Sequence, residues 1–154
     1  MIGSVSARGS APSSELAVLL DTHVLVWLLQ GDERLGARAR AAIEAATIGQ
    51  AGVHVAAISV WELGMLVAKG RLTLDRDVGE WVHAALSLPG MGLIAMEPEI
   101  AVAASRLPGA MHGDPADRLI VATARHMGAM LITGDGLILD YAAAGHVRAL
   151  RASS

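Results

Sequence analysis

Short apolar runs alternate along this chain with longer segments in which apolar residues recur every three or four positions. The runs predict strands at 16–20, 53–58, 92–96, 130–133 and 146–150. The segments between them predict helices at 22–28, 34–47, 59–69, 77–86, 98–106, 114–126 and 137–144. Strands that alternate with helices in this way favour a parallel sheet covered by helices on both faces.

The length of 154 residues and the hydrophobic fraction of 53% predict one globular domain over residues 16–150. We expect the two ends, 1–15 and 151–154, to be disordered extensions. The chain contains no Cys, which excludes disulfides, thiolate zinc sites and Cys nucleophiles and is compatible with a cytoplasmic location. No apolar run reaches the length that spans a membrane.

The formal net charge is −3, and no tract of Lys or Arg is present. Binding to nucleic acid by charge alone needs basic residues that neutralise phosphates, so the composition argues against that class of protein. It leaves open a nucleic-acid enzyme in which a bound metal ion supplies the positive charge. Proteins that bind nucleotide cofactors are disfavoured, because the chain has no G-x-G-x-x-G and no Walker lysine motif.

Two of the predicted strands deliver an Asp to their carboxyl ends. Asp21 directly follows the run 16–20, and Asp135 follows the run 130–133 after one glycine. In α/β proteins the carboxyl ends of parallel strands are where ligands bind. Each residue also has a simpler interpretation, because Asp21 can be a turn or helix-capping residue and Asp135 can belong to an ordinary Asp-Gly turn. We expect Thr22 to cap the helix that follows Asp21.

Glu62 stands three residues after Ser59, and this spacing is that of a capping box, in which the Glu side chain reaches back to the start of its helix. Asp77 and Glu80 have nearly the same spacing, so the pattern alone does not indicate a site. The difference is position: Glu62 begins the helix that directly follows a strand, whereas Glu80 follows no strand. We therefore treat Glu80 as a structural control for Glu62.

Two further carboxylates stand at the start of the predicted helix 114–126. Asp114 is a natural cap and precedes Pro115, which suits the first helical position. Asp117 then falls at the third position, where a negative charge is favoured by the helix dipole. Either Asp could face a site, and we favour Asp117.

Together, these positions predict three or four carboxylates in one cleft. Carboxylates that converge in this way repel one another and raise each other's pKa unless a cation neutralises them. Mg²⁺, which is typically held by carboxylates and substrate phosphates, is the natural cation, and Mn²⁺ is its close substitute. A site of this kind suits hydrolysis of phosphodiester bonds.

The chain resembles the PIN domain and, within it, the VapC-type toxins of bacterial toxin–antitoxin modules. Four stretches carry the resemblance, and they stand at 19–27, 59–63, 112–124 and 131–135. The resemblance implies a three-layer α/β/α sandwich with a central parallel sheet of about five strands. It also implies a metal-dependent endoribonuclease that cleaves RNA, uses Mg²⁺ or Mn²⁺, forms a homodimer and is blocked by a cognate antitoxin.

Matched residue by residue, the resemblance implies that Asp21, Glu62, Asp117 and Asp135 form the catalytic acidic group. Of these, Asp21, Asp117 and Asp135 would bind the metal and Glu62 would position a water. Thr133 matches a hydroxyl position beside the site. Gly134 departs from the family, which often has Asn there.

Several other residues are weaker candidates for the site. Arg118 could contact RNA phosphate or an antitoxin carboxylate, with a solvated helix face as the simpler interpretation. His23 and His112 flank proposed acidic residues, and surface or structural roles are the simpler interpretation for both. Trp61 and the apolar stretch 65–67 suit either an interface or ordinary core packing.

Two other functions remain as alternatives. The first is a catalytically weak PIN-like module that binds RNA or a partner without turnover. The second is a phosphatase-like metal-dependent hydrolase. A haloacid dehalogenase phosphatase has a second Asp two residues after the first, and His23 occupies that place here.

Overall fold

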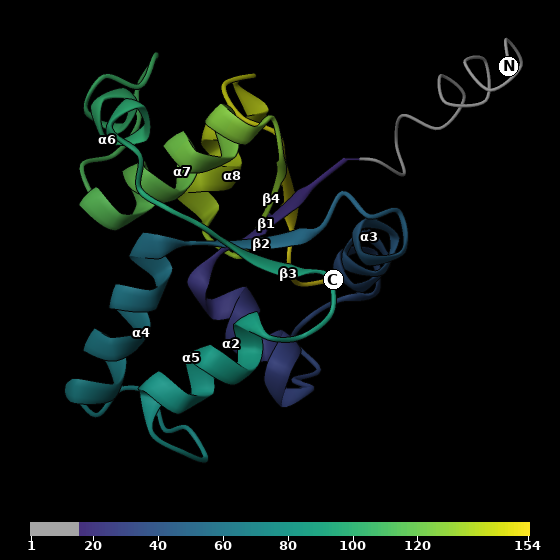
Figure 1. Ribbon diagram of the computed structural model, residues 1–154. Coiled ribbons are helices and arrows are strands. Elements are labelled where there is room, and N and C mark those ends of the chain that lie inside the picture. Colours follow the sequence, from purple (N-terminus) through teal and green to yellow (C-terminus); the bar gives the residue numbers. More distant parts are fainter. Residues whose placement is uncertain (1–15) are drawn as a thin grey trace, which may run out of the picture.

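The computed structural model describes residues 16–154, so the predicted extension at 1–15 lies outside the described residues. One or two helices separate successive strands along the described chain, as the apolar pattern predicted (Figure 1). The strands are β1 (Val18–Leu20), β2 (Val53–Ala56), β3 (Met91–Ile94), β4 (Met130–Thr133) and β5 (Ala149–Arg151). The helices are α2 (Thr22–Gln30), α3 (Ala37–Ile48), α4 (Ala57–Ala68), α5 (Val78–Leu86), α6 (Pro98–Ser105), α7 (Pro115–Met127) and α8 (Gly136–Ala143). None of these described helices is both long and apolar enough to cross a membrane.

The five strands form one parallel sheet in the order β3-β2-β1-β4-β5. Strand β1 lies at the centre, and its residue Leu20 is level with Val55 of β2 and Ile132 of β4. Strands β2 and β3 lie on one side of β1, and β4 and β5 lie on the other. The direction in which successive strands are added to the sheet therefore reverses at β1. Ligands of open parallel sheets bind at such a reversal, at the carboxyl ends of the strands.

Helices cover both faces of the sheet. Side chains of a strand alternate between faces, so Val18 and Leu20 join a cluster with helices α2 to α5, while Leu19 joins a second cluster with α6, α7 and α8. Figure 1 shows these two helix layers on opposite sides of the strands. The prediction of a three-layer α/β/α fold around a parallel sheet of five strands is confirmed.

Helix α4 begins earlier than the sequence predicted. Strand β2 ends at Ala56 rather than at residue 58, and α4 begins at Ala57, with no side chain capping its first turn. Ser59 is therefore inside the helix and fully buried, and Glu62 lies in the second turn. The capping-box interpretation of Ser59 and Glu62 is wrong, because the box requires the hydroxyl residue to precede the helix.

The chain end also differs from the prediction of a disordered tail at 151–154. Arg151 belongs to β5, and Ala152 is fully buried. The Ala152 N–H donates to the Thr133 carbonyl at 2.8 Å, and its own carbonyl accepts from the Gly36 N–H at 2.8 Å. The tail is ordered because these backbone bonds hold it between the sheet and the start of α3.

We predict that deleting residues 151–154 destabilises the protein by about 2 kcal/mol, because two buried backbone hydrogen bonds are lost. The melting temperature would fall by roughly 4–8 °C for a chain of this size. Deleting only 153–154 is the matched control, because it keeps both bonds of Ala152. Equal melting temperatures for the full chain and the longer deletion would show that the tail is not part of the fold.

Candidate functional site

A fully buried hydroxyl joins the carboxyl ends of β1 and β4. Thr133, the last residue of β4, donates its Oγ1 proton to Asp21 Oδ2 at 2.6 Å. The Oγ1 atom of Thr133 also accepts a hydrogen bond from the Asp135 N–H at 3.0 Å. Asp21 and Asp135 therefore lie at neighbouring strand ends, on either side of Thr133.

Asp21 itself caps helix α2. Its Oδ1 accepts the Thr22 N–H at 2.7 Å, so the prediction that Thr22 is the cap is wrong. The side chain of Asp21 is buried, and this burial raises the pKa of its carboxyl group above the ordinary value of 3.8. The hydrogen bonds from Thr133 and Thr22 act in the opposite direction, and the charge of Asp135 adds to the rise.

Helix α4 brings Glu62 to the same place. The Thr22 hydroxyl donates to Glu62 Oε1 at 2.6 Å, and the Thr22 and Ser59 hydroxyls lie 3.0 Å apart. Thr22 thus ties α4 to the first turn of α2, next to Asp21. Partial burial raises the pKa of the Glu62 carboxyl group, the Thr22 hydrogen bond opposes this rise, and the charge of Asp21 reinforces it.

The two acidic residues at the start of α7 have different surroundings. Asp114 is exposed and caps the helix, accepting the Asp117 N–H at 2.9 Å. Asp117 is partly buried, and its Oδ2 lies 2.7 Å from His112 Nε2. Asp117, rather than Asp114, therefore points toward the other carboxylates.

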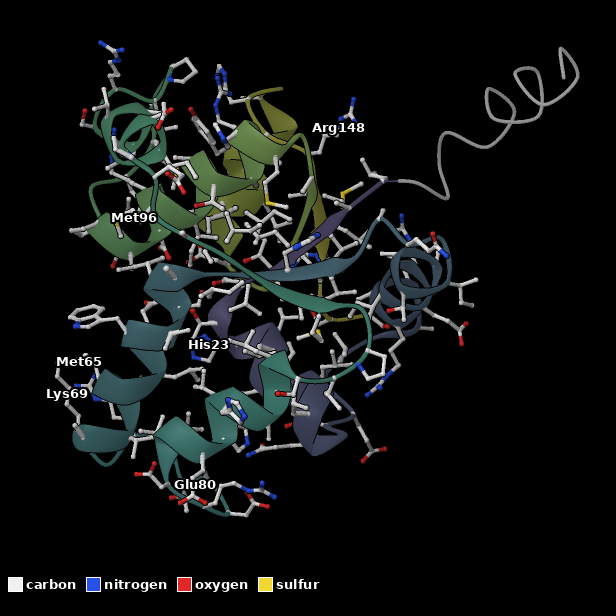
Figure 2. All side chains as sticks on the ribbon, viewed as in Figure 1. His23, Met65, Lys69, Glu80, Met96 and Arg148 are labelled. Atoms are coloured by element: carbon white, nitrogen blue, oxygen red, sulfur yellow. The ribbon has the colours of Figure 1, made fainter. Side chains whose placement is uncertain are left out.

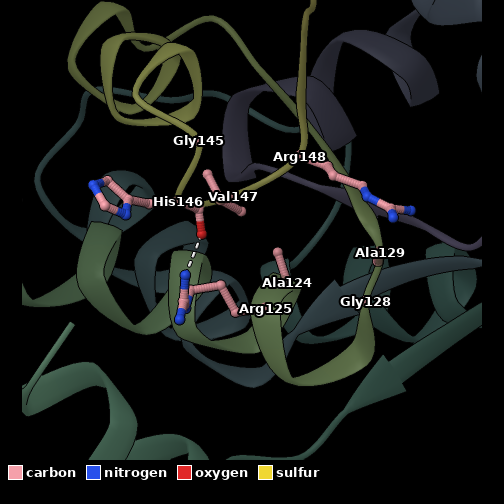
Figure 3. Close-up of a pocket in the computed structure, with 8 residues that line it drawn as sticks. All are labelled: Ala124, Arg125, Gly128, Ala129, Gly145, His146, Val147 and Arg148. Carbon is pink, nitrogen blue, oxygen red and sulfur yellow. Dashed lines mark hydrogen bonds between the residues drawn. The ribbon is translucent and has the colours of Figure 1, made fainter. Parts of the chain in front are cut away.

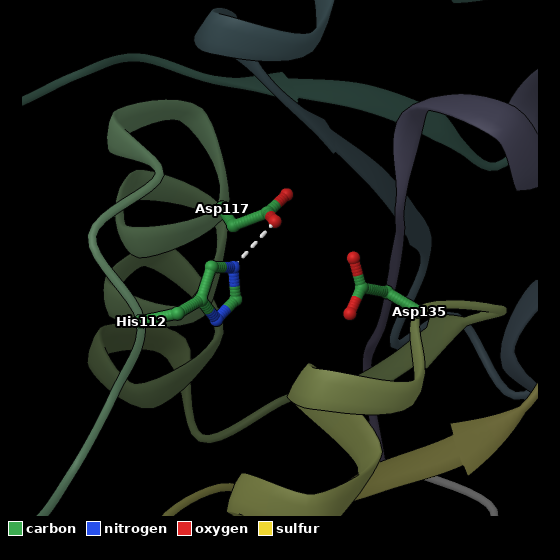
Figure 4. Close-up of side chains that lie close together, drawn as sticks. All are labelled: His112, Asp117 and Asp135. Carbon is green, nitrogen blue, oxygen red and sulfur yellow. Dashed lines mark hydrogen bonds and ion pairs between the residues drawn. The ribbon is translucent and has the colours of Figure 1, made fainter.

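His112 joins the group, although from the sequence it was only a weaker candidate, with a surface or structural role as the simpler interpretation. One ligand atom from each of His112, Asp117 and Asp135 lies within 4.8 Å of the other two (Figure 4). Asp21 and Glu62 stand outside this closest group and flank it. The five-residue spacing between His112 and Asp117 carries no known metal-binding pattern, so only the path of the intervening loop brings the two side chains together.

Carboxylates outnumber the basic side chains at the site, where His112 contacts Asp117. Burial is the main cause that raises the pKa of Asp117 from 3.8 to about 6, the His112 hydrogen bond opposes it, and the charges of Asp114, Asp21 and Asp135 add to it. Within residues 16–154, no Lys or Arg forms an ion pair with these carboxylates. Oxygen ligands with unbalanced negative charge are the donor set that a hard divalent cation prefers.

The Arg118 guanidinium binds backbone carbonyls of this region. Its guanidinium donates to the carbonyl of Ala104 at 2.9 Å and to that of Met111 at 3.1 Å, with a longer contact of 3.4 Å to the carbonyl of His112. Arg118 therefore fastens the loop that carries His112 against α6 and α7.

A separate cavity lies at the other edge of the sheet. It has a volume of about 520 Å³ and is bordered by the end of α7, the residues 128 and 129 just before β4, and the segment 145–148 (Figure 3). Arg125 donates there to the carbonyl of His146. Because the predicted acidic residues all stand near the carboxyl ends of the strands, this cavity is not part of the acidic site.

Glu80 behaves as the structural control that the sequence predicted. It is exposed on α5, and its backbone N–H donates to Asp77, which caps that helix. Figure 2 shows Glu80 at the far end of the lower helix layer.

Known proteins share the sequence pattern and the fold of this chain. A family model described as "PIN domain" matches residues 18–144. Ribonuclease VapC22 of Mycobacterium tuberculosis is 39% identical over 118 residues, which are 77% of this chain and 86% of that protein.

Solved structures share the fold at lower identity. The VapBC2 complex of Rickettsia felis, bound to a DNA fragment from its promoter, has a TM-score of 0.65 at 15% identity, covering 88% of this chain and 98% of that chain. FitAcB of Neisseria gonorrhoeae has a TM-score of 0.59 at 23% identity, covering 86% and 96%. A toxin–antitoxin complex from Klebsiella pneumoniae has a TM-score of 0.50 at 23% identity, covering 77% and 86%.

We predict that the metal-free protein becomes more stable as the pH falls from 7.5 to 5. Asp117 has a pKa of about 6 in the folded chain and 3.8 ordinarily, so over this range the folded state takes up the proton first. The gain in unfolding free energy is on the order of 1 kcal/mol. Denaturant titrations in a chelator would measure it, with Asp117→Asn as the comparison. An unchanged pH dependence in Asp117→Asn would show that this carboxyl group is not responsible.

Proposed function

The chain belongs to the PIN domain family and, within it, to the VapC proteins, and from this premise we propose that it is a metal-dependent endoribonuclease. In this proposal it cleaves RNA phosphodiester bonds as the toxin of a toxin–antitoxin pair. The observation that carries the proposal is the gathering of Asp21, Glu62, Asp117 and Asp135 around the carboxyl ends of β1 and β4, with His112 against Asp117 and no Lys or Arg in an ion pair with them among the described residues. A relative named a ribonuclease, 39% identical to this chain, supports RNA as the substrate.

The residues fit a divalent cation, for which we propose Mg²⁺, with Mn²⁺ as its substitute. Asp21, Asp117 and Asp135 would hold it, since Asp117 and Asp135 belong to the closest group and Thr133 joins Asp21 to Asp135. When bound, such an ion neutralises phosphate charge and makes the attacking water more acidic. Thr133 fixes one oxygen of Asp21 in place and so sets the direction of that carboxylate.

Glu62 has a separate role in this proposal. Its Oε1 accepts from Thr22, so the carboxylate is oriented while its second oxygen stays available to accept a proton from the attacking water. A raised pKa makes this carboxylate a better proton acceptor than an ordinary Glu. The Thr22 bond therefore positions Glu62 as the group that directs water at the phosphate.

We also propose an antitoxin as the protein partner, together with a homodimer. The solved relatives named above include a toxin–antitoxin complex. Helix α4 offers an apolar surface beside the site: Glu62 is its only charged residue, and Trp61 is 58% exposed. Met65 lies on the same helix, and Figure 2 shows it on the outer side.

We predict that Asp21→Asn abolishes RNA cleavage by the purified protein and growth inhibition on expression. The change removes a proposed metal ligand. The loss of cleavage activity should therefore exceed the roughly 10- to 100-fold loss that follows when a hydrogen-bond partner of a metal ligand is removed. Circular dichroism would verify that the variant folds. Glu80→Gln is the matched control, because it removes an exposed carboxylate far from the site and should keep full activity. A folded Asp21→Asn protein with undiminished cleavage would refute the proposed site.

We predict that a chelator stops cleavage and that Mg²⁺ or Mn²⁺ restores it. Metal at about 100 times its dissociation constant should stabilise the fold by about 2.7 kcal/mol, which corresponds to a rise of roughly 5–11 °C in melting temperature. Asp117→Asn should lose most of this rise. If isothermal titration detected no divalent-metal binding to the wild-type chain, the alternative of a binding module without turnover would gain.

A further inference from the structure

We propose that His112 is a positioning residue that holds the Asp117 carboxylate toward Asp135, in the orientation needed to bind the cation. The inference rests on the function proposed above, because it concerns the same site. His112 lies beyond the four carboxylates that the family resemblance indicates. It acts through Asp117 and has no contact of its own with the substrate in this proposal.

The contact between the two side chains is short and sheltered. His112 Nε2 lies 2.7 Å from Asp117 Oδ2, and the side chains are only 22% and 18% exposed. An ionised carboxylate can only accept hydrogen bonds, so the bond to ionised Asp117 requires a proton on His112 Nε2. Hydrogen bonds to a charged group are stronger than neutral ones, and shielding from water strengthens them further. The bond is therefore strong enough to fix a side-chain orientation.

Without His112, a second orientation would be open to the Asp117 side chain. It stands at the third position of α7, where a carboxylate can turn back toward the unpaired N–H groups of the first turn. That orientation would direct it along the helix end and away from Asp135. Repulsion from Asp21 and Asp135 would favour the same rotation, whereas the charge of Asp114, which caps the start of α7, would oppose it. His112 opposes the rotation.

The loop that carries His112 is itself held in place by side chains. Within the described chain, residues 107–113 form no backbone–backbone hydrogen bond. Their carbonyls are held instead by Arg118, which donates to Met111, and by the Tyr141 hydroxyl, which donates to Pro108. Arg118 directly follows Asp117 in α7. The same helical turn therefore carries the carboxylate that binds His112 and the guanidinium that holds the loop of His112. This arrangement fixes the distance between His112 and Asp117 independently of the sheet.

Titration calorimetry with Mn²⁺ on the full chain at one pH would test the inference. We expect His112→Ala to weaken Mn²⁺ binding by about 10- to 100-fold, the usual cost of losing an outer-shell partner. His112→Gln should retain most of the affinity, because its amide N–H reaches the position of Nε2. The matched control is His126→Ala. His126 is an exposed histidine in the last turn of α7, and this variant should bind Mn²⁺ like the wild type.

The outcomes separate this inference from the function on which it rests. Equal affinity of folded His112→Ala and wild type would overturn the positioning role and leave the metal site standing. A directly bound histidine nitrogen in pulsed electron paramagnetic resonance of the Mn²⁺ complex, lost in His112→Ala, would make His112 a ligand and also overturn it. Absence of Mn²⁺ and Mg²⁺ binding by the wild-type chain would overturn the proposed function together with this inference. Both His112 variants keep the backbone carbonyls that Arg118 binds, and circular dichroism would check their fold.

Discussion

Thr133 donates its hydroxyl proton to Asp21 across the junction of β1 and β4, and the geometry of the acidic site depends on this bond. The parallel register places Leu20 level with Ile132, so the next residues of the two strands meet at the sheet edge. Because the same hydroxyl accepts the Asp135 N–H, one fully buried side chain fixes the positions of two carboxylates. The two apolar clusters on either side of the sheet hold these strands together against the repulsion that the site introduces.

The carboxylates also have structural tasks, which helps to explain how a folded chain tolerates them. Asp21, Asp114 and Asp135 cap the helices α2, α7 and α8, so three helix amino ends converge on the site. The partial positive charge of a helix amino end favours a nearby anion. This contribution is modest, and burial still raises the pKa of Asp21 and Asp117. The fold thus brings the negative charges together but leaves them incompletely balanced, which is the condition that favours a bound cation.

Much of this arrangement could be predicted from local sequence patterns. Apolar runs that end in a carboxylate gave the positions of Asp21 and Asp135, because a buried parallel strand and its carboxyl end are encoded within a few residues. The interpretation of Glu62 was less accurate, since Ala57 and Ile58 suit a strand or a helix and the boundary of α4 depends on packing. His112 was only a weaker candidate, because its position depends on Arg118 bonds to the loop and to Ala104. The ordered tail was missed for a similar reason: Ala152 bonds Gly36 and Thr133, which are distant in the sequence.

Helix α4 connects the interior of the site with the surface of the protein. Its buried side holds Ser59 and Leu63, its edge presents Glu62 to Thr22, and its outer side exposes Trp61. A partner that covered the apolar outer side would therefore lie against the residue next to Glu62. It could block access to the acidic group without displacing any carboxylate, because Asp21, Asp117 and Asp135 are anchored on other elements. Inhibition by such a partner and retention of an intact site would thus be compatible in this fold, since the outer side of α4 is separate from the elements that hold Asp21, Asp117 and Asp135.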